Sequence, residues 1–257
     1  MSEKKNKLWF SILSKDARYY SDEPNFIPSD YFEWTKNASQ IADVLESELL
    51  EYLKNNQLES YFNTKMSENV KKWKTISLKW WGLELYSHQK LFPKTTAFIN
   101  SIPNLVSASF NLLEANSSIY PHCGDTNGIY RCHLGLIIPT ELPECGFRVE
   151  NEKKSWKKGE WLIFIDAKEH EAWNKSNANR FIFVIDIIRD EYSHRKNIIN
   201  SIVLTGLFLQ RRAELFSVLY SLKNIQWVKN MIVYILLPFC FISIKIRNTL
   251  SKIGLVS

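Results

Sequence analysis

The fold of this chain is decided by residues 118–189, which contain YPHCGDTN (120–127), RCHLGL (131–136), EHEAWN (169–174) and then Arg180. Three of the five histidines of the chain lie in these motifs. Between the motifs stand short apolar runs typical of β-strands, which recur about every ten residues and are joined by turn sequences. This spacing predicts a mainly β domain of the jelly-roll kind, a double-stranded β-helix.

Hydrophobic periodicity places helices and further strands around this stretch. At residues 39–55, apolar side chains recur at steps of three and four from Ile41 to Leu53, which predicts a helix. A second helix is expected at 93–102, because Pro93 suits the first turn of a helix. Both helices are expected to brace the outer face of the barrel. Strands are expected at residues 73–82, 107–113, 130–138, 146–149, 161–165 and 180–188.

His122 and His170 are candidate metal ligands. They are 48 residues apart, which suits ligands from different strands of a folded sheet. A mononuclear iron site commonly combines two histidines with one carboxylate, and in the usual pattern the carboxylate stands two residues after the first histidine. Gly124 occupies that position, and Asp125 would face the opposite side of an extended segment. Asp125 is therefore either a loop-capping residue before Thr126 or a substitute ligand.

Taken together, the motifs resemble those of the aspartyl/asparaginyl β-hydroxylase family. The resemblance rests on PHCGDTNGIYRCHLGLIIP (121–139), W-x-x-G-E (156–160), EHEAWN (169–174) and RFIFVID (180–186), with WKTISLKWWG (73–82) and PKT (93–95) upstream. It implies the same double-stranded β-helix fold. It also implies an Fe(II)- and 2-oxoglutarate-dependent dioxygenase that consumes O2, hydroxylates an unactivated carbon and releases succinate and CO2. In this family two histidines hold the iron without the carboxylate, and water fills the vacant position.

The resemblance assigns roles to individual residues. It makes His122 and His170 the iron ligands, and it pairs Arg180 with the distal carboxylate of 2-oxoglutarate. A guanidinium suits this task because it binds a carboxylate by two parallel charge-assisted hydrogen bonds. The residues expected to contact the cosubstrate are Trp73, Asn111, Arg131, Cys132, His133 and Arg180. Without the family pattern, an isolated histidine is more often a core or surface residue, and Arg131 would pass for an ordinary residue of an alternating strand.

Composition and charge narrow the class of protein. The 257 residues are 45% hydrophobic and 23% charged, which suits one large folded domain with an appendage. The four cysteines form no C-x-x-C pair, which argues against a zinc site or a disulfide framework and for reduced thiols in the cytoplasm. In residues 191–257 nine basic residues outnumber two acidic ones by seven, so the rest of the chain carries −1 of the net charge of +6. This distribution argues against nucleic-acid binding.

The basic tail is also apolar. Residues 198–209 are strongly apolar, and apolar residues continue at helical steps over 215–222. Residues 231–244 carry no charge and would extend about 21 Å as a helix, less than the roughly 30 Å hydrocarbon core of a bilayer. The run is flanked by Trp227 and Lys229 on one side and by Lys245 and Arg247 on the other. Such flanks are typical of a membrane-interface anchor. The alternative is a pair of helices packed on the barrel or on a second subunit.

Three parts are therefore expected: a region of helix and loop at 1–72, the barrel at 73–190, and the tail at 191–257 as a candidate membrane anchor. The resemblance implies a substrate that carries an aspartyl or asparaginyl side chain. Membrane-associated members of the family hydroxylate the acyl chain of lipid A. This chain resembles them in the stretch at 73–82, in its length and in its basic, apolar tail. The alternative substrate is therefore the acyl chain of lipid A or of another membrane lipid. The protein would then lie at the inner face of the membrane. A non-catalytic barrel that binds peptide or lipid is a further alternative.

Overall fold

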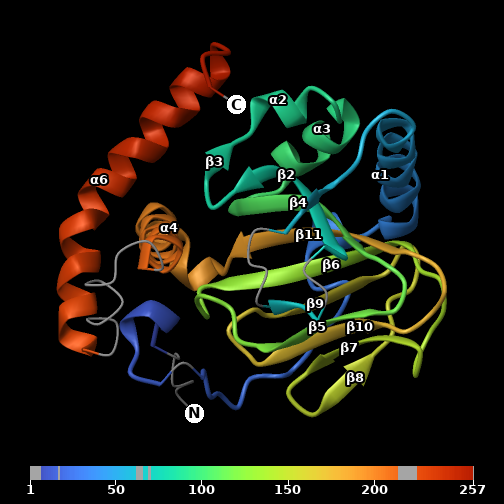
Figure 1. Ribbon diagram of the computed structural model, residues 1–257, viewed down its shortest axis with the longest axis horizontal. Coiled ribbons are helices and arrows are strands. Elements are labelled where there is room, and N and C mark those ends of the chain that lie inside the picture. Colours follow the sequence, from blue (N-terminus) through green and yellow to red (C-terminus); the bar gives the residue numbers. More distant parts are fainter. Residues whose placement is uncertain (1–6, 17, 62–65, 69–70, 214–224, 257) are drawn as a thin grey trace.

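Two antiparallel β-sheets face each other at the centre of the molecule, and helices cover the outer side of the larger sheet (Figure 1). The structure, a computed structural model, describes residues 7–16, 18–61, 66–68, 71–213 and 225–256. The larger sheet contains β1 (Glu59–Ser60), β2 (Trp73–Trp80), β3 (Leu83–Glu84), β4 (Leu105–Leu113), β6 (Ile129–Ile137), β9 (Trp161–Ile165) and β11 (Arg180–Ile188). The smaller sheet contains β5 (Ser117–His122), β7 (Cys145–Val149), β8 (Glu152–Lys154) and β10 (His170–Asn174).

The chain winds back and forth between the two sheets. The larger sheet has the order β1-β2-β4-β11-β6-β9, with β3 paired to β2, and the smaller has the order β5-β10-β7-β8. Among the strands from β4 to β11, the first strand in each sheet therefore pairs with the last strand of that sheet. In the larger sheet β4 pairs with β11, and in the smaller sheet β5 pairs with β10. This topology is a double-stranded β-helix. The predicted fold class, mainly β with flanking helices, is confirmed.

Side-chain alternation gives the larger sheet two different faces. On the outer face, apolar residues such as Phe110, Leu134 and Phe183 pack against α1 (Ala38–Leu53) and α3 (Pro93–Ser101) in one core cluster. Successive side chains of a strand point to opposite faces, so the intervening residues, such as Asn111 and His133, turn inward. These inward residues line a cavity between the sheets. The fold thus separates an apolar outer core from an inner face on which polar residues stand beside a second apolar cluster with Phe147, Phe164 and Ile182.

Most of the expected elements are present, but five strands were not expected, namely β1, β3, β5, β8 and β10. The helices predicted at 39–55 and 93–102 and all six predicted strands are confirmed, with ends shifted by a few residues. The sequences of β5 and β10 do not show the pattern of a strand. In β5, Tyr120-Pro121 interrupts an apolar alternation, and in β10 the acidic residues around His170 do so. The short helices are η1 (Ser11–Leu13), η2 (Glu33–Thr35), α2 (Tyr86–Gln89) and η4 (Asp190–Arg195).

One carboxylate joins the two bracing helices. Glu48 of α1 accepts hydrogen bonds from the backbone N–H groups of Lys94 and Thr95 at 2.8 and 2.7 Å, and from Thr95 Oγ1 at 2.7 Å. These two N–H groups belong to the first turn of α3, where donors have no partner within the helix. The residue at the N-cap of α3, Phe92, makes no side-chain capping bond. Glu48 therefore supplies the missing cap from another helix.

We expect Glu48→Ala to lower the free energy of unfolding by about 1–2 kcal/mol, the usual cost of a lost N-terminal cap. Urea denaturation followed by circular dichroism measures this loss. Glu51→Ala is the matched control on the same helix, because Glu51 pairs with exposed Lys54 and its loss should cost at most about 0.5 kcal/mol. Equal effects of the two substitutions would contradict the capping role.

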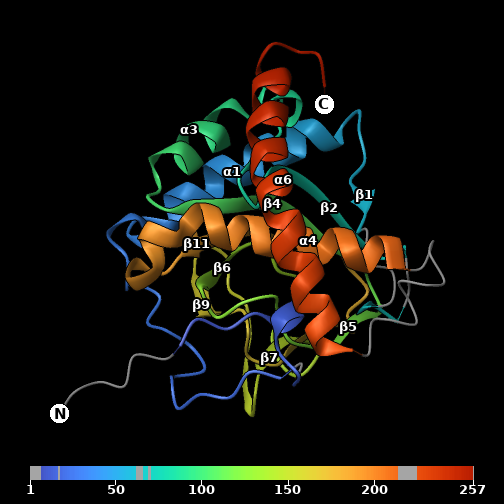
Figure 2. The same ribbon diagram turned by 90° about the vertical axis from the view of Figure 1, so that its left-hand side faces the viewer.

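The C-terminal tail forms α4 (Lys196–Ala213) and α6 (Gln226–Lys252), which cross each other beside the barrel (Figure 2). One side of each helix is packed: Ile199 and Val203 of α4 and Val233 of α6 join a core cluster with Trp81 and Ile129. The alternative in which the tail helices pack on the barrel is thus confirmed. The helical steps predicted at 215–222 lie outside the described residues, and the three-part division of the chain stays a prediction.

The second tail helix is longer than its uncharged run. The run at 231–244 alone is too short for a bilayer, but α6 passes through Pro238 and continues into the polar residues at both ends, over 27 residues. This is about 40 Å of helix, longer than the roughly 30 Å hydrocarbon core. Within the described residues, α6 is the one helix long and apolar enough to cross a membrane by length and composition.

Candidate functional site

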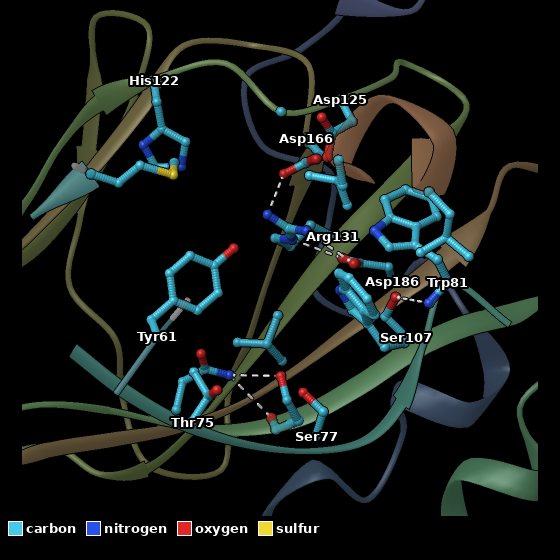
Figure 3. Close-up of a pocket in the computed structure, with 18 of the residues that line it drawn as sticks. Tyr61, Thr75, Ser77, Trp81, Ser107, His122, Asp125, Arg131, Asp166 and Asp186 are labelled. Atoms are coloured by element: carbon cyan, nitrogen blue, oxygen red, sulfur yellow. Dashed lines mark hydrogen bonds and ion pairs between the residues drawn. The ribbon is translucent and has the colours of Figure 1, made fainter. Parts of the chain in front are cut away.

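A cavity lies between the inner faces of the two sheets (Figure 3) and continues to the tail helices α4 and α6, with a total volume of about 1320 Å³. The larger sheet contributes side chains from β2, β4, β6 and β11, and the smaller sheet contributes side chains from β5 and β10. Seven of the eight predicted site residues line it: Trp73, Asn111, His122, Arg131, His133, His170 and Arg180. The topology therefore gathers residues that are more than 100 positions apart in the sequence.

His122 and His170 lie side by side on neighbouring strands. They are register partners in the pairing of β5 with β10, and their ring centroids are 4.2 Å apart. Nδ1 of His122 donates to the carbonyl of Tyr120 at 2.7 Å, and Nδ1 of His170 donates to the carbonyl of Lys168 at 2.8 Å. A carbonyl only accepts, so each ring carries its proton on Nδ1 and keeps a lone pair on Nε2. This is how metal-binding histidines are commonly oriented.

Burial keeps both imidazoles neutral. It lowers the pKa of His122 to about 4, against the small raising effect of its bond to Tyr120. It lowers the pKa of His170 well below the ordinary value of a histidine, and the neighbouring His122 adds to this effect. A metal requires the neutral imidazole, because a protonated ring has no lone pair to donate. At neutral pH both rings are in the form that a metal ligand needs.

Sequence analysis missed a third residue beside this pair, Asp166. It follows β9 directly and is almost completely buried, at 1% exposure. Its Oδ1 lies 3.9 Å from Nε2 of His170. Burial raises the pKa of its carboxyl to about 7, although Arg131 acts in the opposite direction. The only signal in the sequence was an acidic residue at the end of the apolar run WLIFI, four positions before His170.

Asp166 occupies the space that a side chain at position 124 would need. A Cβ built on Gly124 would overlap both Oδ2 and Cγ of Asp166, and the amide of Gly124 donates to the carbonyl of Asp166 at 2.9 Å. The usual position of the third ligand therefore carries no side chain, and a carboxylate from another loop fills the place. Glycine at 124 is required by this close approach.

Arg131 is held by two aspartates. It makes two hydrogen bonds to the carboxylate of Asp186, at 2.8 and 2.9 Å, and its Nη1 lies 2.5 Å from Oδ1 of Asp166. It shares the inner face of β6 with His133, because side chains two residues apart on a strand point to the same side. In this structure its donors are directed to carboxylates of the protein, so its expected contact with the cosubstrate stays a prediction. Its visible effect is to hold Asp166 beside the histidine pair.

Arg180 is different, because it has no carboxylate partner among the described residues. Its side chain is buried, at 1% exposure, and its Nε has no hydrogen-bond partner in the described part of the chain. Its guanidinium carbon lies 4.5 Å from the ring centre of Trp156. Burial lowers its pKa to about 10, which still leaves it charged at neutral pH. A buried, charged and unpaired group is costly for a protein, and among the described residues the ring of Trp156 is the group recorded against this guanidinium.

Aromatic and polar residues complete the walls around Arg180. Nε1 of Trp156 donates to Nδ1 of His133 at 3.4 Å, and burial lowers the pKa of His133 well below its ordinary value. Trp73 stacks on Tyr61 with ring centres 3.7 Å apart, and its Nε1 donates to Oδ1 of Asn111 at 3.4 Å. These residues form a partly apolar pocket beside the guanidinium.

Two expectations need correction or refinement. Cys132 does not line the cavity: it is fully buried in the outer core between the sheet and the bracing helices. The reason is strand alternation, since Cys132 lies between two inward residues of β6.

Asp125 lines the cavity near Arg131, and burial raises its pKa to about 6. The capping of this loop instead falls to Thr126, whose Oγ1 accepts from the amide of Gly128 at 3.0 Å.

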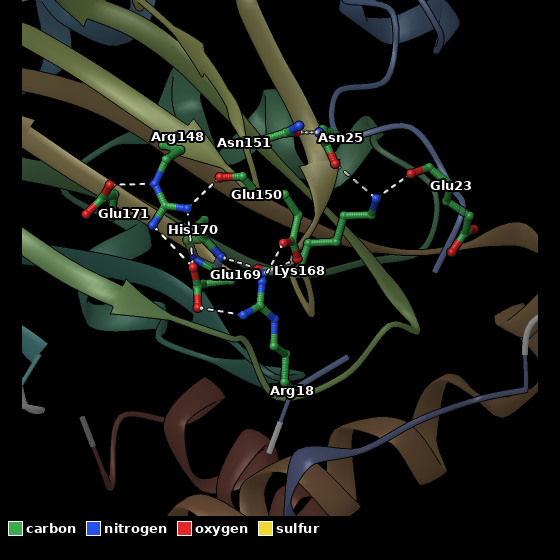
Figure 4. A network of polar contacts seen from close by, with 10 residues as sticks. All are labelled: Arg18, Glu23, Asn25, Arg148, Glu150, Asn151, Lys168, Glu169, His170 and Glu171. Carbon is green, nitrogen blue, oxygen red and sulfur yellow. Dashed lines mark hydrogen bonds and ion pairs between the residues drawn. The ribbon is translucent and has the colours of Figure 1, made fainter. Parts of the chain in front are cut away.

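A surface network holds the strand that carries His170 (Figure 4). Arg148 donates to Glu171 at 2.5 Å and to Glu169 at 3.2 Å, so it bridges the two residues that flank the histidine. From the N-terminal segment, Arg18 contacts Glu169 at 3.6 Å and Glu150 at 2.7 Å. The start of β10 is therefore fixed from both sides.

Comparison with known proteins agrees with this geometry. A family model described as aspartyl/asparaginyl β-hydroxylase matches residues 39–190, which is more than half of the chain. The chain belongs to the aspartyl/asparaginyl β-hydroxylase family. The match begins in α1 and ends with β11 and its connection to η4, so it includes both sheets and the bracing helices.

Relatives within this family are named as hydroxylases. The ornithine lipid ester-linked acyl 2-hydroxylase of Rhizobium tropici is 37% identical over 118 residues, which are 46% of this chain and 42% of that protein. The human aspartyl/asparaginyl β-hydroxylase is 36% identical over 104 residues, which are 38% of this chain and 14% of that protein. The chain thus matches less than half the length of either relative.

Among solved structures, a prolyl-4-hydroxylase from Pseudomonas putida is similar over 60% of this chain and 90% of its own, at 12% identity and a TM-score of 0.40.

The residues present fit the iron that the aspartyl/asparaginyl β-hydroxylase family implies. Among the described residues, no group of three or more His, Cys, Asp and Glu stands in ligand geometry. The donor set is instead two neutral imidazoles with Nε2 available and a buried carboxylate close by. Oδ1 of Asp166 is ion-paired with Nη1 of Arg131 at 2.5 Å. Two nitrogen donors and one nearby oxygen suit an iron(II) ion with further positions open.

We expect Gly124→Ala to damage the site of this β-hydroxylase family member, because the new methyl group would displace the carboxylate of Asp166. Overpacking of this kind costs about 1–3 kcal/mol of stability, and iron affinity should fall with it. Gly128→Ala is the matched control in the same loop: its Cβ would lie 2.9 Å from Cδ1 of Leu8, the end of a side chain that can turn away. Metal titration and thermal melting of both variants test this, and full iron affinity in Gly124→Ala would contradict it.

Proposed function

We propose that this protein is an Fe(II)- and 2-oxoglutarate-dependent hydroxylase, which consumes O2 and releases succinate and CO2. The observation that carries the proposal is Arg180: a buried guanidinium without a carboxylate partner among the described residues, in the same cavity as two neutral histidines. A dicarboxylate that chelates a metal at one end and pairs with an arginine at the other matches this arrangement. Membership of a family of hydroxylases supports the same conclusion.

In this proposal each residue has one task. His122 and His170 hold the iron, which when bound supplies the activation of O2. Arg180 fixes the far carboxylate of 2-oxoglutarate by two charge-assisted hydrogen bonds. His133, neutral and bonded to Trp156, lines the cosubstrate pocket with Trp73. The aromatic walls exclude water, which protects the reacting groups and strengthens the pairing of charges.

A second proposal concerns the substrate, which we propose is an acyl chain and not an aspartyl or asparaginyl side chain. The cavity continues from the histidine pair to apolar side chains of α4 and α6. A relative that matches this chain is named as a lipid acyl 2-hydroxylase. The apolar helix α6 supports a location at the inner face of the membrane.

The reaction class is tested by succinate release from 2-oxoglutarate in the presence of Fe(II) and O2. We expect succinate and O2 consumption in equal amounts, both abolished by a chelator of Fe(II). The same assay with vesicles that contain acyl lipids, and separately with an Asp- and Asn-bearing peptide, compares the two substrate classes. A protein that binds no iron and yields no succinate under any of these conditions would be a non-catalytic barrel, and the proposal would fail.

A further inference from the structure

The cavity does not end at the histidine pair. The same continuous space is lined by Leu204, Leu207 and Phe208 of α4 and by Leu236, Phe239, Cys240 and Ser243 of α6. These residues belong to the tail, outside the part of the chain that matches the family model. The groove between α4 and α6 is therefore connected with the candidate active site.

Small polar side chains keep the passage open between the groove and the site. On the inner face, β2 presents Thr75 and Ser77, and β4 presents Ser107 and Ser109 (Figure 3). At the corresponding positions of the outer face the same strands carry bulky residues such as Leu78 and Phe110. At the groove end the passage meets Trp81 and Leu83. The path is lined by small side chains at the sheet and by apolar side chains at the helices. Such a lining suits a flexible alkyl chain.

The side of α6 that faces away from the barrel is apolar and exposed. Its side chains recur at steps of three and four, as on one face of a helix. They are Trp227 (68% exposed), Met231, Tyr234, Ile235, Ile242 and Ile246. Large exposed apolar surfaces mark contacts with a partner or a membrane. We call these six residues the outer stripe.

Charge distinguishes a membrane from a protein partner for the outer stripe. Residues 225–256 contain four basic and no acidic residues. Arg211 of α4 and Arg247 of α6 are exposed and line the cavity at the groove. An apolar helix with basic residues is complementary to a bilayer whose surface carries anionic headgroups. A symmetric contact between two copies would instead bring like charges together.

We propose that the groove between α4 and α6 is the entry route for the acyl chain of an anionic bilayer lipid, with the outer stripe lying in the membrane interface. The headgroup would stay near Arg211 and Arg247 at the mouth. The chain would pass Trp81 and reach the histidine pair along the serines of β2 and β4. This inference rests on the proposed hydroxylase function and adds the path by which its substrate arrives.

Photolabelling tests the route. The probe is a phosphatidylglycerol with a diazirine near the end of one acyl chain, carried in vesicles of phosphatidylcholine and phosphatidylglycerol. After irradiation, mass spectrometry identifies the labelled residues. We expect labels on the groove-lining residues of α4 and α6 and on the inner faces of β2 and β4. Labels confined to the outer stripe would overturn the proposal, because the acyl chain would then stay in the membrane.

Two tryptophan variants make the test specific. Ser243→Trp adds bulk at an exposed position that lines the groove, and we expect it to reduce labelling of β2 and β4 about tenfold. Ile242→Trp adds bulk one residue away on the outer stripe and should keep the labelling pattern. Equal labelling of β2 and β4 in both variants would overturn the route. Absence of vesicle binding, with a dimer in size-exclusion chromatography, would assign the outer stripe to a second copy and also overturn it.

Failure of this inference is distinguishable from failure of the proposed function. Succinate release without lipid reports on the hydroxylase alone, whereas labelling of β2 and β4 reports on the route alone. Succinate without inner labelling would keep the hydroxylase and reject the route. Inner labelling without succinate or bound iron would keep the route and reject the hydroxylase.

Discussion

Replacing Arg180 by leucine is expected to raise the KM for 2-oxoglutarate at least about 30-fold. The cause is the loss of a charge-assisted pair in a buried site, which costs about 2–5 kcal/mol when one partner is removed. Arg180 is buried and has no carboxylate partner among the described residues, so we expect its charge to serve the ligand and not the fold. Steady-state succinate release at increasing 2-oxoglutarate concentrations measures the effect.

Stability separates this role from a structural one. Removing a buried unpaired charge is neutral or stabilising, so Arg180→Leu without ligand should melt at or above the temperature of the wild type. The rise in melting temperature that 2-oxoglutarate gives to the wild type should vanish. Arg180→Lys is the matched control, because it keeps the charge and loses the planar fork, and we expect an intermediate KM. A large fall in melting temperature with an unchanged KM would show that Arg180 serves packing.

Replacing either His122 or His170 by alanine should abolish succinate release. Each imidazole would supply one of two protein nitrogens to the iron, so the loss should exceed the roughly 10–100-fold that removal of an outer-shell partner costs. The two variants should be equally inactive, since the residues are register partners at the same site. Succinate assays and iron content after dialysis measure the two effects.

His194→Ala is the control for these variants. His194 lies exposed in η4 and does not line the cavity, so its loss should leave both iron content and turnover unchanged. Full activity in His170→Ala would exclude the histidine pair as the metal site. Restoration of turnover in His170→Ala by added imidazole would support a ligand role over a packing role.

Where periodicity was strong, sequence reasoning predicted the structure well. The near-continuous apolar run of β11 and the three- and four-residue steps of α1 located these elements, because burial of both faces or of one face leaves a pattern in the sequence. The histidine pair was found through the spacing of the family motifs. Cys132 was misassigned because a motif names neighbours in the chain, whereas alternate residues of a strand face opposite sides.

Features that depend on long-range contacts escaped prediction. Asp166 reaches the site because Gly124 leaves room for it, and this relation between two loops leaves no pattern in either one. The pairing of Arg131 with Asp186 follows from the neighbouring positions of β6 and β11 in the sheet. The connection of the α4–α6 groove with the cavity depends on how the tail packs on the barrel. None of these follows from local propensity.

The central claim is that His122 and His170 hold one Fe(II) beside 2-oxoglutarate. Its most direct test is anaerobic titration of the protein with Fe(II) and 2-oxoglutarate, followed by visible absorption of the chelate that the two form. The account predicts a charge-transfer band that requires both additions, saturates at one Fe(II) per chain and is absent from His122→Ala and His170→Ala. A full band in either variant, or no band in the wild type, would contradict it.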